Sequence, residues 1–85
     1  MKQFTFIETP SHGYLVVKLS EIDGLFFSQY SPSRKGNIYL EEDIDAPRFL
    51  QILRDRGEKF EIKFEYREDF DPFFPTTNAL PPLYA

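Results

Sequence analysis

Cysteine and tryptophan are both absent from this chain of 85 residues, and histidine and methionine each occur once. Without Cys there is no disulfide framework, no thiolate nucleophile and no Cys-based zinc or iron–sulfur site. A reducing compartment fits this composition, so we expect a cytoplasmic protein. The chain also lacks the run of roughly 18 apolar residues that a membrane-spanning helix needs, and "MKQFTFIETP" lacks the apolar stretch of a signal peptide. We therefore expect no membrane association.

An excess of positive charge is also missing. The chain has 14 Asp and Glu against 10 Lys and Arg, which gives a formal net charge of −4. Proteins that bind the nucleic-acid backbone usually carry a basic field. Nucleic acid is therefore a disfavoured partner. A nucleic-acid-associated accessory protein, with contacts through Arg34, Lys35, Arg54 and Arg56, stays an alternative.

Aromatic residues, in contrast, are abundant. The chain holds 10 Phe and 5 Tyr, and its length corresponds to one small domain that needs a dense core. Fifteen rings exceed what one such core needs. We therefore expect some of them in a surface patch or an interface, where Phe and Tyr are enriched.

The apolar pattern predicts one α+β domain over residues 1–68. Helical spacing of Phe49, Ile52 and Leu53 predicts a helix over Ala46–Arg56, which Gly57 would end. Alternating or β-branched runs predict strands at Gln3–Glu8, Tyr14–Leu19, Leu25–Ser31, Ile38–Glu41 and Lys59–Arg67. We expect a small antiparallel sheet of these five strands, in the chain order β-β-β-β-α-β, with the helix packed on one face.

The acidic stretch "YLEEDIDAPRFL" is the part of the sequence that most resembles a site. Because a helix start needs acceptors for its free N–H groups and favours negative charge, Asp43 and Asp45 are predicted to be helix caps. The alternative is a carboxylate-dependent metal enzyme, in which Asp43 and Asp45 bind Mg²⁺ or Mn²⁺ together with Asp69 or Asp71.

Signatures of catalysis are otherwise lacking. The single histidine, His12, lies in the turn "PSHG", where a solvated turn residue is more common than a proton carrier. No G-x-S-x-G elbow and no phosphate-binding glycine loop occurs. We therefore expect no enzymatic activity, no cofactor and no metal.

From residue 69 the chain becomes rich in Pro and aromatic residues, which predicts an extended tail over residues 69–85. The tail contains "PPLY" and "DPF", which match short motifs read by adaptor domains. It either folds back over the sheet or docks into a partner or a second copy of the chain. The residues predicted to contact a partner are Tyr30, Arg34, Lys35, Phe70, Phe73, Phe74, Leu83 and Tyr84.

Two stretches, "SHGYLVV" and "YLEEDIDAPRFL", resemble a loose set of short proteins carried by bacterial phages, prophages and plasmids. The resemblance covers about residues 4–53, and Ile44 stands where that set often has Cys, so no thiol chemistry is expected. It implies a mobile-element origin. Because small phage proteins commonly block a host protein, we expect a non-catalytic interaction protein in the bacterial cytoplasm, an inhibitor of a host or anti-phage defence protein, acting alone or as a homodimer.

Overall fold

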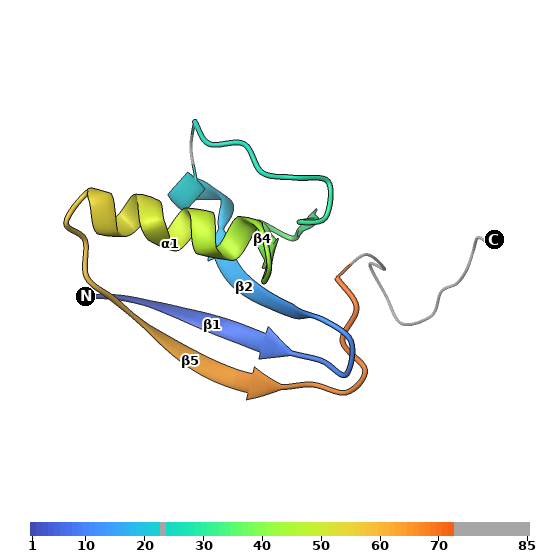
Figure 1. Ribbon diagram of the computed structural model, residues 1–85. Coiled ribbons are helices and arrows are strands. Elements are labelled where there is room, and N and C mark those ends of the chain that lie inside the picture. The colour runs from blue at the N-terminus through green and yellow to red at the C-terminus, as the bar shows by residue number, and fades with distance from the viewer. Residues whose placement is uncertain (23, 73–85) are drawn as a thin grey trace.

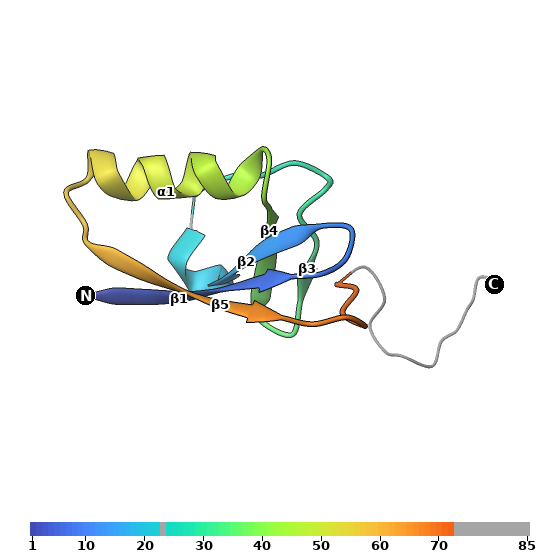
Figure 2. The ribbon, with the colours of Figure 1, turned by 60° about the horizontal axis from the view of Figure 1, so that its bottom comes forward.

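The computed structural model describes residues 1–22 and 24–72, which form one sheet and one α-helix (Figure 1). Figure 2 shows α1 on one side of the sheet, so the described chain has two layers. In chain order the elements are β1 (Lys2–Glu8), β2 (Gly13–Lys18), the 3-10 helix η1 (Leu19–Ile22), β3 (Ser33–Arg34), β4 (Asn37–Glu41), α1 (Asp45–Asp55) and β5 (Phe60–Tyr66). The predicted α+β class and the order of elements are confirmed.

The sheet has five strands in the order β3-β4-β2-β1-β5. The pairs β1–β2, β2–β4 and β3–β4 are antiparallel, whereas β5 runs parallel to β1. The sheet is therefore mixed rather than wholly antiparallel as predicted. The reason is α1, because this helical crossover carries the chain from the end of β4 back to the end of the sheet where β4 begins, so β5 runs in the same direction as β4 and β1.

The third strand is shorter than predicted and lies later in the chain. Residues 25–32 are irregular, and only Ser33–Arg34 pair with β4. The turn between β3 and β4 is formed by Lys35 and Gly36, whose φ angles are 51° and 84°. Positive φ at both central residues is the geometry that closes a two-residue hairpin. Leu25 and Phe27 instead pack against the core from the loop, so their apolar character does not signal a strand.

The helix begins and ends within one residue of the prediction. At its C-terminus Gly57 has a φ of 74°. Its N–H donates to the Arg54 carbonyl at 3.0 Å, and the Glu58 N–H donates to the Leu53 carbonyl at 3.0 Å. This pair of hydrogen bonds satisfies carbonyls that the helix leaves free, and it needs the left-handed conformation that glycine adopts most readily.

The core lies between α1 and the face of the sheet that α1 covers. Phe49 and Leu53 of the helix pack on Leu15 and Leu40 of the two central strands, and each of these side chains is at most 2% exposed. Burying an aliphatic or aromatic side chain of this size contributes about 1.5–3 kcal/mol. Phe4 joins them with its ring edge-on to Phe49 at 5.5 Å between centroids.

Residues 1–22 and 24–72 place no helix on the other face of the sheet, yet part of this face is also buried. Tyr14 alternates with Leu15 along β2 and so points to this face. Tyr14 is 4% exposed and its neighbour Ile7 is 3% exposed. The residues after β5 supply the cover, because the Phe70 ring lies 6.2 Å from the Tyr14 ring and 5.3 Å from the Tyr39 ring.

Candidate functional site

Two grooves adjoin at the end of the sheet where β1 and β4 end and β2 begins. The first, of about 360 Å³, is lined by His12, Tyr14, Tyr30, Glu41, Asp43 and Ile44. The second, of about 310 Å³, is lined by Thr9, Ser11, His12, Tyr14, Phe70, Asp71 and Pro72. They share His12 and Tyr14. We call the lining of the first groove the acidic-aromatic surface.

The turn between β1 and β2 holds His12 at this surface. The Thr9 Oγ1 atom donates to the His12 carbonyl at 2.7 Å and accepts the N–H groups of Ser11 and His12. The Thr9 N–H donates to the same carbonyl at 2.8 Å. Gly13 follows with no room for a side chain, because a Cβ there would lie 2.6 Å from the Phe6 ring. The turn is therefore held by the hydrogen bonds of Thr9 and by the packing of the Phe6 ring against Gly13.

Glu41 shapes the entry to the helix. One oxygen of its carboxylate, Oε1, accepts the N–H groups of Asp43 at 2.9 Å and of Ile44 at 3.0 Å. Ile44 is the residue that precedes the first turn, and no side chain caps the helix. This local turn leaves the Asp43 side chain exposed and Ile44 53% exposed. The predicted cap at Asp43 is therefore wrong, because Glu41 takes the free N–H groups before the helix begins.

Asp45 is the first helical residue and is 2% exposed. Its Oδ2 accepts the Ser28 N–H at 3.0 Å and the hydroxyls of Ser28 and Ser31, each at 2.5 Å. The negative charge stands in the first turn, where the helix dipole favours it. However, its hydrogen bonds go to the loop 28–31 and not to the helix, so the predicted cap at Asp45 is also wrong.

This buried carboxylate positions Tyr30. The Ser28 hydroxyl accepts the Tyr30 N–H at 3.2 Å, and the Ser31 hydroxyl accepts the Glu41 N–H at 2.9 Å. Arg48 also ties the loop to the helix, since its guanidinium donates to the Phe26 carbonyl and lies 4.9 Å from the Phe27 ring centroid. Tyr30, which is 53% exposed, is thus presented from a supported loop.

Tyr14 forms the floor of the surface, and its surroundings keep its hydroxyl neutral. Burial raises the pKa of Tyr14 above the ordinary 10.0, and the negative charges of Asp71, Glu41 and Glu42 raise this pKa further. Four acidic or phenolic groups therefore act on one another here. Negative potential and aromatic rings are both concentrated at this end of the sheet.

Phe70 is the second aromatic element of this region. Its half-buried ring packs on Tyr14 and Tyr39, and the Arg67 guanidinium lies 5.8 Å from its centroid. Arg67 also pairs with Glu65 at 2.5 Å. The ring is thus held on the sheet between aromatic side chains and a cation, and residues 67–72 continue the folded domain.

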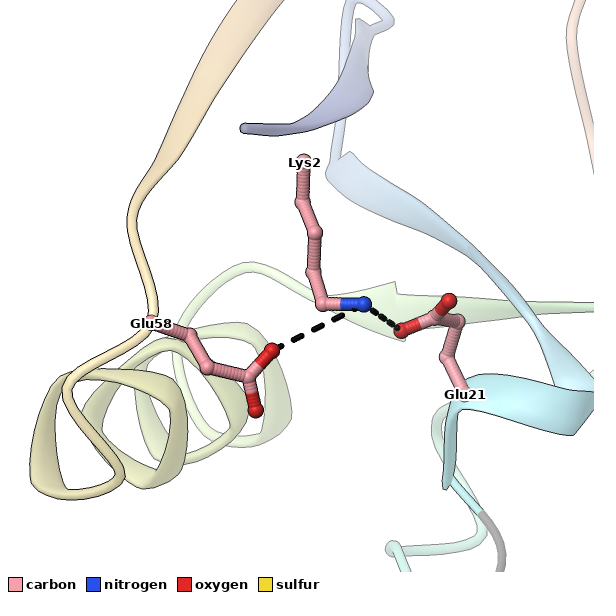
Figure 3. Close-up of polar contacts among 3 residues, drawn as sticks. All are labelled: Lys2, Glu21 and Glu58. Carbon is pink, nitrogen blue, oxygen red and sulfur yellow. Dashed lines mark hydrogen bonds and ion pairs between the residues drawn. The ribbon is translucent and has the colours of Figure 1, made fainter.

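The opposite end of the sheet has a different arrangement of charge (Figure 3). The Lys2 ammonium group lies 2.9 Å from the Glu21 carboxylate and 3.6 Å from that of Glu58, from three separate parts of the chain. The hydrogen bond that Lys2 donates to the Glu21 carboxylate raises the pKa of Lys2 above 10.5. Lys2 is therefore held between two carboxylates at this end.

The predicted contact residues fall in different places. Tyr30 lies in the acidic-aromatic surface, and Phe70 lies in the adjoining groove against the sheet. Arg34 and Lys35 lie at the β3–β4 turn, at the far end of β4 from Glu41. Phe73, Phe74, Leu83 and Tyr84 lie outside the described residues. His12 and Ile44 were not predicted to line a contact surface. For Ile44 the available signal was its position as a single apolar residue between Asp43 and Asp45.

The residues of the proposed metal site do not converge. Asp45 is turned into the loop by the two serines, whereas Asp43 is exposed. In residues 1–22 and 24–72 no three His, Asp or Glu side chains are grouped so that they could hold a metal ion.

No protein-family model, curated protein or solved structure matches the chain. As far as the structure describes the chain, it contains no helix with the length and apolar character to cross a membrane.

Proposed function

We propose that the protein is a non-catalytic binding module that holds a basic segment of another protein on the acidic-aromatic surface. The observation that carries this proposal is the combination in one groove of two carboxylates, Glu41 and Asp43, with the exposed side chains of Tyr30 and Ile44. Lys and Arg side chains favour such a setting, because the carboxylates attract the charge and the rings and methyl groups pack on the aliphatic stem.

The surroundings extend this complementarity. Glu42 and Asp71 lie close enough to affect the ionisation of Tyr14. Exposed aromatic side chains are enriched at the centres of protein interfaces, where they supply contact area at a small cost in side-chain entropy. The segment that fits therefore carries one or two cationic side chains beside apolar residues.

Binding is better supported than catalysis. The imidazole of His12 is exposed and has no hydrogen-bond partner among residues 1–22 and 24–72, so no second group orients it as a base. One basic residue of the nucleic-acid alternative is already engaged within the protein, since the Arg54 guanidinium lies 5.5 Å from the Phe60 ring centroid.

The biological setting follows from the resemblance to proteins of bacterial mobile elements. We place the protein in the bacterial cytoplasm, and its partner is a host protein whose activity is blocked when a basic segment is covered. An anti-phage defence protein is one such target. The exposed position of Tyr30 and Ile44 on a supported loop and helix entry suits a preformed contact surface.

Affinity capture with matched variants tests the proposal. The full-length chain is immobilised and exposed to bacterial lysate at several salt concentrations, and bound proteins are identified by mass spectrometry. We expect one partner that Tyr30→Ala and Asp43→Lys no longer retain. Asp55→Lys is the control, because it makes the same charge change at an exposed site at the far end of the helix.

Affinities measured with the purified partner then give the size of each contribution. Removal of a central aromatic side chain from an interface typically costs about 2 kcal/mol, so Tyr30→Ala is expected to weaken binding roughly 30-fold. Asp43→Asn is expected to weaken it about 3- to 10-fold and to reduce its salt dependence. Equal retention of the partner by all variants would contradict the proposal.

A further inference from the structure

β5 forms one edge of the sheet and is much longer than the strand at the other edge. It has 7 residues, whereas β3 has 2. Figure 1 shows β5 along the margin of the sheet, beside β1 and away from β4. No strand in the described part of the chain pairs with its outer side. Such an edge offers a row of backbone groups to another strand.

The backbone hydrogen bonds show which groups point outward. The Lys2 N–H donates to the Lys59 carbonyl at 3.2 Å, and the Arg67 N–H donates to the Glu8 carbonyl at 2.8 Å. Odd-numbered residues of this strand therefore turn their N–H and C=O toward β1. Because the direction alternates along a strand, the N–H and C=O groups of the even-numbered residues point away from the sheet. These residues are Phe60, Ile62, Phe64 and Tyr66.

The same strand exposes two large aromatic side chains. Phe64 is 64% exposed and Tyr66 is 62% exposed, on the face that carries α1. Phe60 and Ile62, earlier in β5, are partly buried against the core. The Phe64 ring packs beside the Phe6 ring, whose centroid lies 5.6 Å away. The second half of β5 is therefore an apolar strip next to free backbone groups.

The opposite face of β5 carries Glu61, Lys63 and Glu65, and Arg67 follows directly after the strand, so the charges alternate in sign. Charges at an edge usually prevent strands from pairing. Here the alternation has another consequence, because an antiparallel copy of the strand can place every positive charge opposite a negative one. This self-complementarity depends on register.

We propose that two copies of the chain join through β5, antiparallel, about a two-fold axis at Phe64. Phe64 then lies opposite Phe64 of the second copy, and Ile62 lies opposite Tyr66. On the other face Lys63 pairs with Glu65 and Glu61 pairs with Arg67, each twice because the contact is symmetric. The two sheets become one continuous sheet with both helices on the same side.

Neighbouring registers are less favourable. An axis at Lys63 places the two Lys63 side chains opposite each other and Glu61 opposite Glu65, which is repulsive. An axis at Ile62 keeps opposite charges together but sets the exposed Tyr66 ring opposite the carboxylate of Glu58 instead of an apolar side chain. Only the axis at Phe64 combines charge pairing with apolar partners for both exposed aromatic side chains.

Charge exchange tests the interface on the full-length chain. Lys63→Glu would face Glu65 twice, and we expect dimerisation, measured by sedimentation equilibrium, to weaken about 10-fold or more. The double variant Lys63→Glu with Glu65→Lys restores opposite pairs, so its dimer is expected to return to within about 3-fold of the original. Circular dichroism of each variant shows that the fold is retained.

Disulfide capture tests the register. Because the natural chain contains no Cys, each introduced Cys can form a disulfide only with another introduced Cys. A mixture of Lys63→Cys and Glu65→Cys chains is expected to form a mixed disulfide dimer faster than either variant alone. If Lys63→Cys alone forms its disulfide dimer faster than the mixture, the axis lies at Lys63. If Lys63→Cys with Glu61→Cys forms the fastest mixed disulfide, the axis lies at Ile62. Either result would overturn the proposed register. A wild-type chain that is monomeric at all concentrations, or a dimer unchanged by Lys63→Glu, would overturn the interface.

Discussion

Charged side chains are arranged differently at the two ends of the sheet. At the end where β1 and β5 begin, Lys2 is shared by Glu21 and Glu58, so positive and negative groups neutralise one another. At the end where β4 finishes, Glu41 and Asp43 line a groove with Tyr30, and no Lys or Arg of the described residues lines it with them. The first arrangement holds parts of one chain together, whereas we propose that the second receives a cationic side chain of another protein.

The buried carboxylate Asp45 separates these roles within a single acidic stretch. It is hydrogen-bonded inside the protein, while Asp43, two residues earlier, is exposed. Replacement of the two residues should therefore have different effects. Loss of Asp45 is expected to reduce stability, and loss of Asp43 is expected to reduce binding.

Asp45→Ala is expected to have the largest effect on stability. It leaves the Ser28 N–H and the hydroxyls of Ser28 and Ser31 without their acceptor in a buried site. The free energy of unfolding is expected to fall by about 2–4 kcal/mol, measured by urea denaturation. Asp55→Ala, at an exposed site, is the control and should change it by less than about 0.5 kcal/mol. A similar loss in both would contradict the role of Asp45.

Phe70→Ala is expected to have the next largest effect. The ring covers Tyr14 and Tyr39 on the face that has no helix. Because Phe70 is only half-buried, we expect a loss of about 1–2 kcal/mol in the free energy of unfolding, together with faster quenching of tyrosine fluorescence. Phe26→Ala, at a ring that is 84% exposed, should cost much less. Unchanged stability of Phe70→Ala would show that residues 67–72 do not cover the sheet.

Tyr14→Phe is expected to change the pH dependence of stability. Burial and then the nearby carboxylates raise the pKa of Tyr14 in the folded chain above 10.0. Above that pH the unfolded chain loses this proton first, so the unfolded chain binds fewer protons and wild-type stability falls as pH rises. The variant should lose this part of the alkaline decline, as seen in urea denaturation over a pH series. If the free energy of unfolding of wild type and of Tyr14→Phe changed with pH in the same way, the raised pKa of Tyr14 would be contradicted.

Lys2→Met is expected to have the smallest effect on stability. The hydrogen bond that Lys2 donates to Glu21 raises the pKa of Lys2 above 10.5, so the favourable contribution of Lys2 to stability is complete below that pH and is lost as pH rises through the folded pKa. The two side chains are only partly buried, so salt screens the pair. The melting temperature of wild type should approach that of the variant at high salt and at high pH. A difference that grows with salt would argue against an ion pair.

Local signals in the sequence predicted much of the fold. The spacing of apolar residues and Gly57 gave the helix to within one residue at each end, and strict alternation gave β5. These features depend on neighbours in the chain. The parallel direction of β5 could have been predicted from the helical crossover that precedes it.

Features that depend on distant contacts could not be predicted in this way. The apolar residues 25–27 suggested a strand, but Leu25 and Phe27 pack on the core from an irregular loop. Asp45 looked like a cap, and its actual partner Ser28 lies 17 residues earlier. Nothing local to "SHGYLVV" shows that Tyr14 is covered by Phe70.

The difference between the two ends of the sheet can be tested most directly by NMR. The ¹⁵N-labelled full-length chain is titrated with a short peptide in which Lys and Arg alternate with Leu, at low and at high salt. We predict chemical-shift changes at His12, Tyr30, Asp43 and Ile44 that weaken at high salt, with Lys2 and Glu21 unaffected. Equal changes at both ends, or none at the acidic-aromatic surface, would contradict the proposed function.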